Sequence, residues 1–89
     1  MIERNIRIQN RLGHHARAAA KLVGLASTFQ SRILLVRDDR EVNAKSIMGV
    51  MMLAASAGTE IRMIAEGEDE SNAIDALAEL INDRFGEGE

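Results

Sequence analysis

The pattern of apolar and polar side chains predicts four short strands. In residues 2–8, three isoleucines fall on one face of an extended chain and three polar side chains on the other. This period of 2 is typical of a half-buried strand. Residues 60–66 alternate in the same way, although one isoleucine falls on their polar face. Residues 33–36 are apolar and mostly branched, which predicts a third strand. Two aspartates then form a predicted turn, and residues 40–43 are the predicted fourth strand, which pairs with the third as a hairpin.

Three other segments have the spacing of helices. In residues 16–27 apolar side chains recur at i, i+3, i+4 and i+7, while Arg17 and Lys21 share the opposite side. A short helix is predicted over about 47–54 and a longer one over about 69–84, whose acidic first turn suits the helix dipole. The resulting order, βαββαβα, predicts one sheet with helices on one face.

Composition indicates a single globular domain over residues 1–89, with 46% hydrophobic and 28% charged residues. The chain has no cysteine, so it forms no disulfide and nothing points to an oxidising compartment. It shows no leader pattern and no apolar run near the ~18 residues of a membrane span, so we expect a cytoplasmic protein without membrane insertion. A net charge of −3 and the lack of a basic stripe argue against a nucleic-acid partner.

The chain's two histidines, His14 and His15, come directly before the alanine-rich helix. Histidine is a poor N-cap, so its position there is unusual. A phosphoryl group on this ring would meet the free N–H groups of the helix and the guanidinium of Arg17. The alternatives are a surface pair without function and a metal site. Adjacent side chains diverge and no cysteine or carboxylate cluster completes a ligand set, so we expect no metal and no cofactor.

The short helix after Ser46 is apolar on nearly every side. One interpretation is a buried helix, which we expect for Val50 and Leu53, and the other is an exposed docking patch. The candidate partner-binding residues are Ile47, Met48, Met51 and Met52, together with Lys21 of the preceding helix. Ser46 is a candidate N-cap, and Lys45 beside it would offset the charge of an added phosphate.

The segments GHHARAA (13–19) and NAKSIMGVM (43–51) resemble HPr, the histidine-containing phosphocarrier family of bacterial phosphotransferase systems. The likeness covers essentially the whole chain in length, in the order of elements and in the spacing of the two motifs. It implies an α+β fold, the open-faced β-sandwich, in which four antiparallel strands are covered on one face by three helices.

The resemblance also implies a function as a phosphocarrier. His15 would be phosphorylated on Nδ1 by Enzyme I, with phosphoenolpyruvate upstream, and would pass the group to the IIA domain of a sugar or nitrogen phosphotransferase system. Arg17 would stabilise the phosphoryl group, and the apolar patch of the short helix would dock both partners. Ser46 matches the site that HPr kinase/phosphorylase modifies in many members, and we expect a monomer.

Two positions depart from the family pattern. His14 stands where a leucine-like residue is usual, and Ala18 stands where proline is usual. Proline in the first helical turn presets φ, so we expect these changes to affect the transfer rate and the choice of partner rather than the role of His15.

A phosphocarrier holds a phosphohistidine intermediate and is not a stand-alone catalyst. The main alternative is a regulatory module of the same fold, which would report phosphorylation state to enzymes or transcription factors. A third possibility is a structural interaction domain, in which His15 would have no chemical role.

Overall fold

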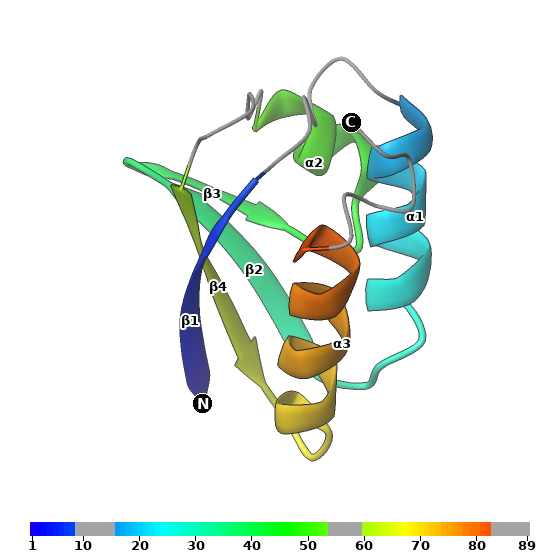
Figure 1. The fold of residues 1–89 in the computed structure, drawn as a ribbon, viewed down its shortest axis with the longest axis vertical. Coiled ribbons are helices and arrows are strands. Elements are labelled where there is room, and N and C mark those ends of the chain that lie inside the picture. Colours follow the sequence, from blue (N-terminus) through cyan, green and yellow to red (C-terminus); the bar gives the residue numbers. More distant parts are fainter. Residues whose placement is uncertain (9–15, 54–59, 83–89) are drawn as a thin grey trace.

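The computed structural model describes residues 1–8, 16–53 and 60–82, which form four strands and three helices in the predicted order (Figure 1). The elements are β1 (Ile2–Arg7), α1 (Ala16–Ala26), β2 (Arg32–Arg37), β3 (Arg40–Asn43), α2 (Ile47–Met52), β4 (Glu60–Glu66) and α3 (Glu70–Asn82). The helix ends predicted at Ala54 and Arg84 lie outside the described residues. The sequence pattern predicted all seven elements, although α2 ends at Met52, with Leu53 as its C-cap, instead of continuing to about residue 54.

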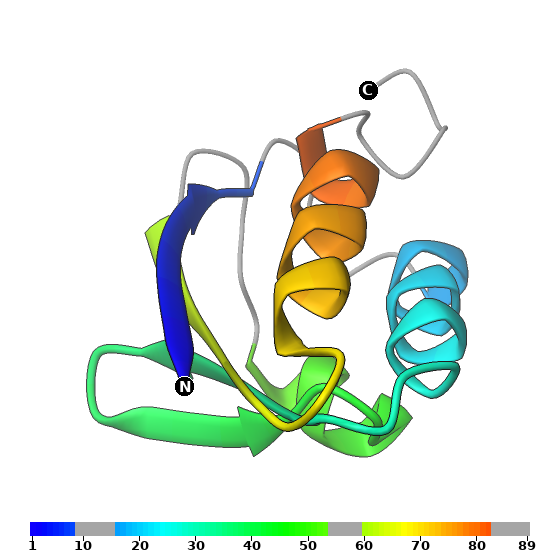
Figure 2. The same cartoon turned by 90° about the horizontal axis from the view of Figure 1, so that it is seen from below.

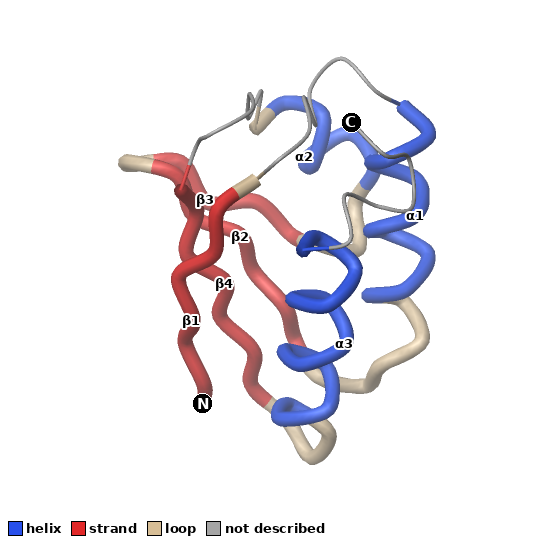
Figure 3. Tube along the Cα trace, in the orientation of Figure 1, coloured by secondary structure: helices blue, strands red, loops and turns tan. Residues whose placement is uncertain are grey.

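The four strands form one antiparallel sheet in the order β1-β4-β2-β3 (Figure 3). β4 lies between β1 and β2, so the central pairings join segments that are far apart in the sequence. In this register Leu35 lies opposite Met63, and Leu34 lies opposite Ile64. The Leu34–Ile64 pair is half-buried on the face away from the helices, which explains the apolar residue on the otherwise polar face of β4.

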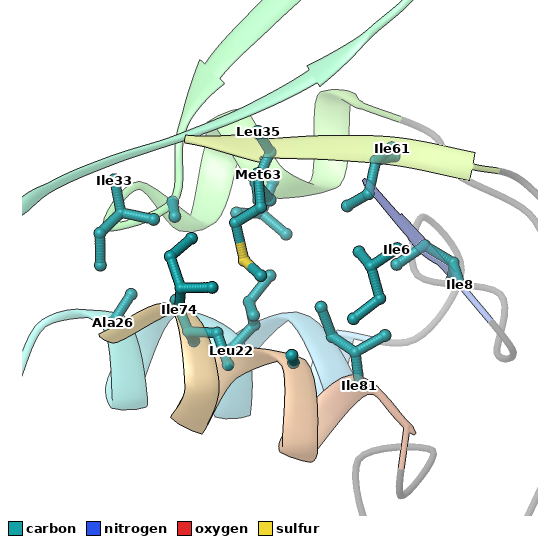
Figure 4. Packing of buried hydrophobic residues seen from close by; sticks show 14 of the residues in the cluster. Ile6, Ile8, Leu22, Ala26, Ile33, Leu35, Ile61, Met63, Ile74 and Ile81 are labelled. Carbon is teal, nitrogen blue, oxygen red and sulfur yellow. The ribbon is translucent and has the colours of Figure 1, made fainter. Parts of the chain in front are cut away.

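The helices cover one face of the sheet and enclose the core (Figure 2). Alternate side chains of the strands point toward side chains of α1 and α3 in the close-up of Figure 4. The largest fully buried side chains are Ile8, Leu22, Ile33, Leu35, Leu53, Ile61, Met63, Ile74, Leu77 and Ile81. Each such side chain contributes about 1.5–3 kcal/mol by leaving water. This core fixes the position of the helices that carry the candidate site.

Asp69, which precedes α3, connects two turns at one end of the molecule. Its carboxylate accepts hydrogen bonds from the backbone N–H groups of Gln30 and Ser31, both at 2.9 Å, and from the Ser31 hydroxyl. The Ser31 hydroxyl and the Gln30 N–H lower the pKa of Asp69 below its ordinary value. Gly67 lies against Ser31 with φ +153°, where a Cβ would come within 2.7 Å of the Ser31 backbone, so only glycine fits.

The first residue of the chain is held to the same end of the molecule. Glu70 accepts a hydrogen bond from the Gly67 N–H at 3.1 Å, and its carboxylate lies 2.9 Å from the N-terminal ammonium of Met1. The ammonium, more than the Gly67 N–H, lowers the pKa of Glu70. An exposed ion pair between Arg4 and Asp75, at 2.9 Å, ties β1 to α3 a little further along.

Candidate functional site

The predicted phosphoryl acceptor, His15, and its neighbour His14 lie outside the described residues. Helix α1 begins at Ala16, directly behind His15, as the sequence predicted. Its first turn carries no acidic side chain, so the helix does not neutralise its own positive end within these 11 residues. Arg17 lies in that first turn and is exposed. The start of α1 can therefore offer backbone N–H groups and one guanidinium to an anion.

Ser46 is the N-cap of α2, which confirms the structural role predicted for it. Its backbone is extended, with φ −110° and ψ 114°, and its hydroxyl oxygen accepts a hydrogen bond from the Gly49 N–H at 3.1 Å. This bond satisfies one of the free donors in the first turn of a helix. The residue is half-buried, so part of it is in contact with solvent.

The segment before Ser46 is held by two further hydrogen bonds. The side-chain oxygen of Asn43 accepts from the Lys45 N–H at 2.8 Å, and the Lys45 ammonium donates to the carbonyl oxygen of Phe29 at 2.7 Å. Sequence reasoning treated Lys45 only as a charge beside Ser46. The structure shows that Lys45 also anchors the start of α2 to the connection between α1 and β2.

Two arginines at the other end of α2 were missed by the sequence analysis. Arg37 donates to the carbonyl oxygen of Leu53 at 3.0 Å, and Arg40 donates to that of Met52 at 2.9 Å. They flank the two-residue turn of the β2–β3 hairpin, in which Asp38 has φ 55°. α2 has no basic residue in its own last turn, so these arginines supply the cations that suit a helix C-terminus.

The exposed side of α2 is apolar. Ile47 is 39% exposed, Met48 67% and Met52 65%, whereas Met51 is half-buried against the core and Val50 is fully buried. The expected burial of Val50 and Leu53 is therefore confirmed, and so is the exposure of Ile47, Met48 and Met52. Met51, which was also expected in the exposed patch, is less exposed than predicted. Among the described residues the only other large apolar side chain with such exposure is that of Met1.

α1 and α2 pack against each other, which brings the predicted site residues onto neighbouring elements (Figure 1). Arg17 and Lys21 are exposed on α1, beside the helix that presents the methionines. A Cβ on Gly49 would lie 3.3 Å from the Cβ of Val42, so glycine lets α2 pack closely on β3. The predicted site residues in the described part of the chain therefore lie on two helices that are in contact.

The described part of the chain has neither a cluster of metal ligands nor a membrane-spanning helix. Within residues 1–8, 16–53 and 60–82, no three histidine, cysteine or acidic side chains gather as metal ligands. No helix in those ranges is long and apolar enough to cross a membrane.

Comparison with known proteins identifies the family. The family model for the PTS HPr component phosphorylation site matches residues 2–83. The phosphocarrier protein HPr of Xylella fastidiosa is 58% identical over 87 residues, 98% of each chain. HPr-C-His from Thermoanaerobacter tengcongensis has a TM-score of 0.92 at 50% identity over 98% of each chain. An HPr dimer from that organism has a TM-score of 0.79 at 50% identity, over 98% of this chain and all of the other. The chain therefore belongs to the HPr family, the phosphocarrier proteins of the phosphotransferase system.

Proposed function

We propose that His15 accepts a phosphoryl group from Enzyme I and passes it to the IIA domain of a sugar or nitrogen phosphotransferase system. The observation that carries the proposal is the start of α1 directly behind His15, in a chain that matches the HPr family over residues 2–83. The first turn of α1 supplies donors and a positive dipole end, and Arg17 adds a formal charge.

The proposed chemistry moves one phosphoryl group in two steps. In the first, Nδ1 of His15 bonds to phosphorus while the bond from phosphorus to the donor's leaving group breaks. In the second, the acceptor's nucleophile bonds to phosphorus and the phosphorus–nitrogen bond of His15 breaks, which returns the imidazole. Because such transfers depend mainly on positioning and charge stabilisation, Arg17 acts by donating to the phosphoryl oxygens.

Both partners would use the same surface, called here the docking surface: Ile47, Met48, Met51, Met52 and Lys21. Its exposed methionines are adaptable side chains that suit contacts with more than one protein. A phosphocarrier must leave each partner after transfer, so a small interface, near or below about 1,200 Å² in total, is expected. The surface includes Lys21 of α1, the helix against which α2 packs, so a partner seated on it would also contact the helix that follows His15.

Ser46 is the proposed regulatory site, modified by an HPr kinase/phosphorylase. Its hydroxyl already lies at the N-terminus of α2, where a negative group is favourable to the helix. The same negative group would stand next to Ile47 and Met48, and an apolar partner would have to desolvate it. Modification would therefore weaken docking while leaving the fold intact.

We further propose that the chain works as a cytoplasmic monomer. One docking surface can serve donor and acceptor in turn, so neither step needs a second copy. Because several solved relatives are dimers, the oligomeric state of the chain should be measured alongside each kinetic experiment.

Incubation of the chain with Enzyme I and labelled phosphoenolpyruvate tests the proposal. We expect one acid-labile, base-stable label per chain, as phosphohistidine gives. His15→Ala should abolish the label, whereas His14→Leu, which restores the side chain usual in the family, should retain it.

The result also separates the proposed function from its alternatives. Label on His14 would overturn the assignment of His15. A chain that takes no label, yet binds Enzyme I or a IIA domain, would be a regulatory module rather than a carrier. A chain that neither takes label nor binds would be a structural interaction domain.

A further inference from the structure

Methionine is the side chain of this protein most readily oxidised by peroxides. The chain has no cysteine, tryptophan or tyrosine, and it has five methionines. Three of the five, Met48, Met51 and Met52, lie within five consecutive positions of α2. A two-electron oxidant therefore finds most of its targets on one short helix.

Exposure separates these methionines further. Met48 and Met52 are 67% and 65% exposed, whereas Met63 in β4 is fully buried, and Met51 is half-buried. Met1 is 71% exposed but lies at the N-terminus, at the opposite end of the molecule from α2 (Figure 1). Because susceptibility to oxidation follows exposure, the docking surface contains two open targets, Met48 and Met52, and one partly protected residue, Met51. Met1 is a remote target, and Met63 is fully protected.

We propose that Met48 and Met52 are reversible oxidation sites, through which a peroxide-class oxidant disables the docking surface. The thioether sulfur attacks one peroxide oxygen, the O–O bond breaks and an S–O bond forms. Sulfur is oxidised by two electrons and the peroxide is reduced to water or an alcohol. A dithiol-dependent methionine sulfoxide reductase reverses the step, giving back the thioether, a disulfide and water.

The chemical consequence follows from the position of the two side chains. A sulfoxide is polar and accepts hydrogen bonds, so a partner that buries it must remove its water without providing a matched donor. Neither side chain belongs to the core, so the oxidised chain stays folded. This inference rests on the docking role proposed above, and it adds a control of that role that is independent of Ser46.

The test uses the whole chain treated with hydrogen peroxide. Peptide mass mapping should show oxygen added at Met1, Met48 and Met52 at least about tenfold faster than at Met63. The KM for Enzyme I-dependent phosphorylation should rise about tenfold at constant kcat, and sulfoxide reductase with a dithiol should restore it. The melting temperature should change little.

A Met48→Leu, Met52→Leu double variant is the matched control, compared with itself before and after peroxide so that any change in its starting KM cancels. It still oxidises at Met1, and its KM should not respond. Equal oxidation of Met63, an unchanged KM, unfolding of the oxidised chain, or a double variant as sensitive as the parent would each overturn the proposal. If the untreated chain takes no phosphoryl group, the proposed function fails, and the mass map still decides the oxidation sites.

Discussion

Arg17 is exposed in the first turn of α1, directly behind the residue proposed to carry the phosphoryl group. Alanine has a helix propensity at least as high as arginine, so Arg17→Ala should leave stability unchanged. Loss of charge-assisted hydrogen bonds should slow phosphorylation of His15 by about tenfold to a hundredfold. Arg17→Lys should recover only part of the rate, because an ammonium lacks the planar fork of a guanidinium. Rapid-quench phosphorylation measures these rates, and full recovery with lysine would reduce Arg17 to a point charge.

The hydroxyl oxygen of Ser46 caps α2 and is also the proposed phosphorylation site. Ser46→Asp keeps an acceptor for the Gly49 N–H and adds a charge, while Ser46→Asn keeps an acceptor without the charge. We expect both variants to melt close to the parent. Because the charge must be desolvated on docking, only the aspartate variant should show a higher KM in Enzyme I-dependent phosphorylation, by about tenfold. Equal KM values for the two variants, at low and at high salt, would leave Ser46 as a cap only.

At the scale of elements, α2 has opposite requirements on its two sides. Met48→Asp adds a charge to a side chain that is 67% exposed, so it should raise the KM of both transfer steps about tenfold and leave circular dichroism unchanged. Val50→Asp places a carboxylate in the core, which costs several kcal/mol and should unfold a chain of this size. Thermal melts followed by circular dichroism compare the pair. A Met48→Asp variant that melts far below the parent would show that the proposed docking surface is structural.

The elements themselves could be predicted because their periods are local. Alternation marked β4, the i, i+3, i+4 spacing marked α1, and Ser46 marked the start of α2. The capping of α2 by Arg37 and Arg40 could not be predicted. The local sequence of a hairpin does not indicate whether its arginines are solvated or bind a carbonyl group of a distant segment. The strand order could not be predicted either, since periodicity states which face is buried and not which strand is the neighbour.

At the scale of the whole molecule, Asp69 illustrates the same limit. From the sequence, Asp69 is expected only to favour the start of a helix. In the structure its carboxylate accepts a hydrogen bond from the N–H of Ser31, 38 positions earlier in the chain. Its long-range partner, Ser31, carries no local signal of this pairing. The candidate docking residues were found because their pattern lies within one helix, whereas contacts between turns depend on the folded arrangement.

The lowered pKa of Asp69 predicts how stability depends on pH. A carboxyl group with a lower pKa in the folded state binds fewer protons there than in the unfolded chain, so it stabilises the fold above about pH 4. This contribution is lost as the pH falls through the folded-state pKa. Urea unfolding at a series of pH values from 7 to 2 gives the free energy of unfolding of Asp69→Ala and of the parent. The variant should be less stable than the parent at pH 7, and this difference in free energy should narrow as the pH falls. A constant difference across this range would show that the carboxylate charge plays no part.

Glu70→Gln provides a control for the Asp69 measurement. The pKa of Glu70 is lowered mainly by the Met1 ammonium. The difference in the free energy of unfolding between Glu70→Gln and the parent should therefore also narrow as the pH falls. Acetylation of the Met1 amine removes the ammonium, so it should reduce the difference between Glu70→Gln and the parent, whereas the difference for Asp69→Ala should not change. The two variants therefore separate a contact between turns from a contact with the chain terminus.

The strand order β1-β4-β2-β3 has a consequence for the order of events during synthesis of the chain. A ribosome releases β1, α1, β2 and β3 before β4, and neither β1 nor β2 can pair with its central neighbour until residue 66 has left the exit tunnel. Until then only the β2–β3 hairpin has its strand partner, and β1 presents an unpaired edge. The nascent chain must therefore keep its first strand unpaired until β4 has left the tunnel, and the sheet closes late, when β4 inserts between β1 and β2.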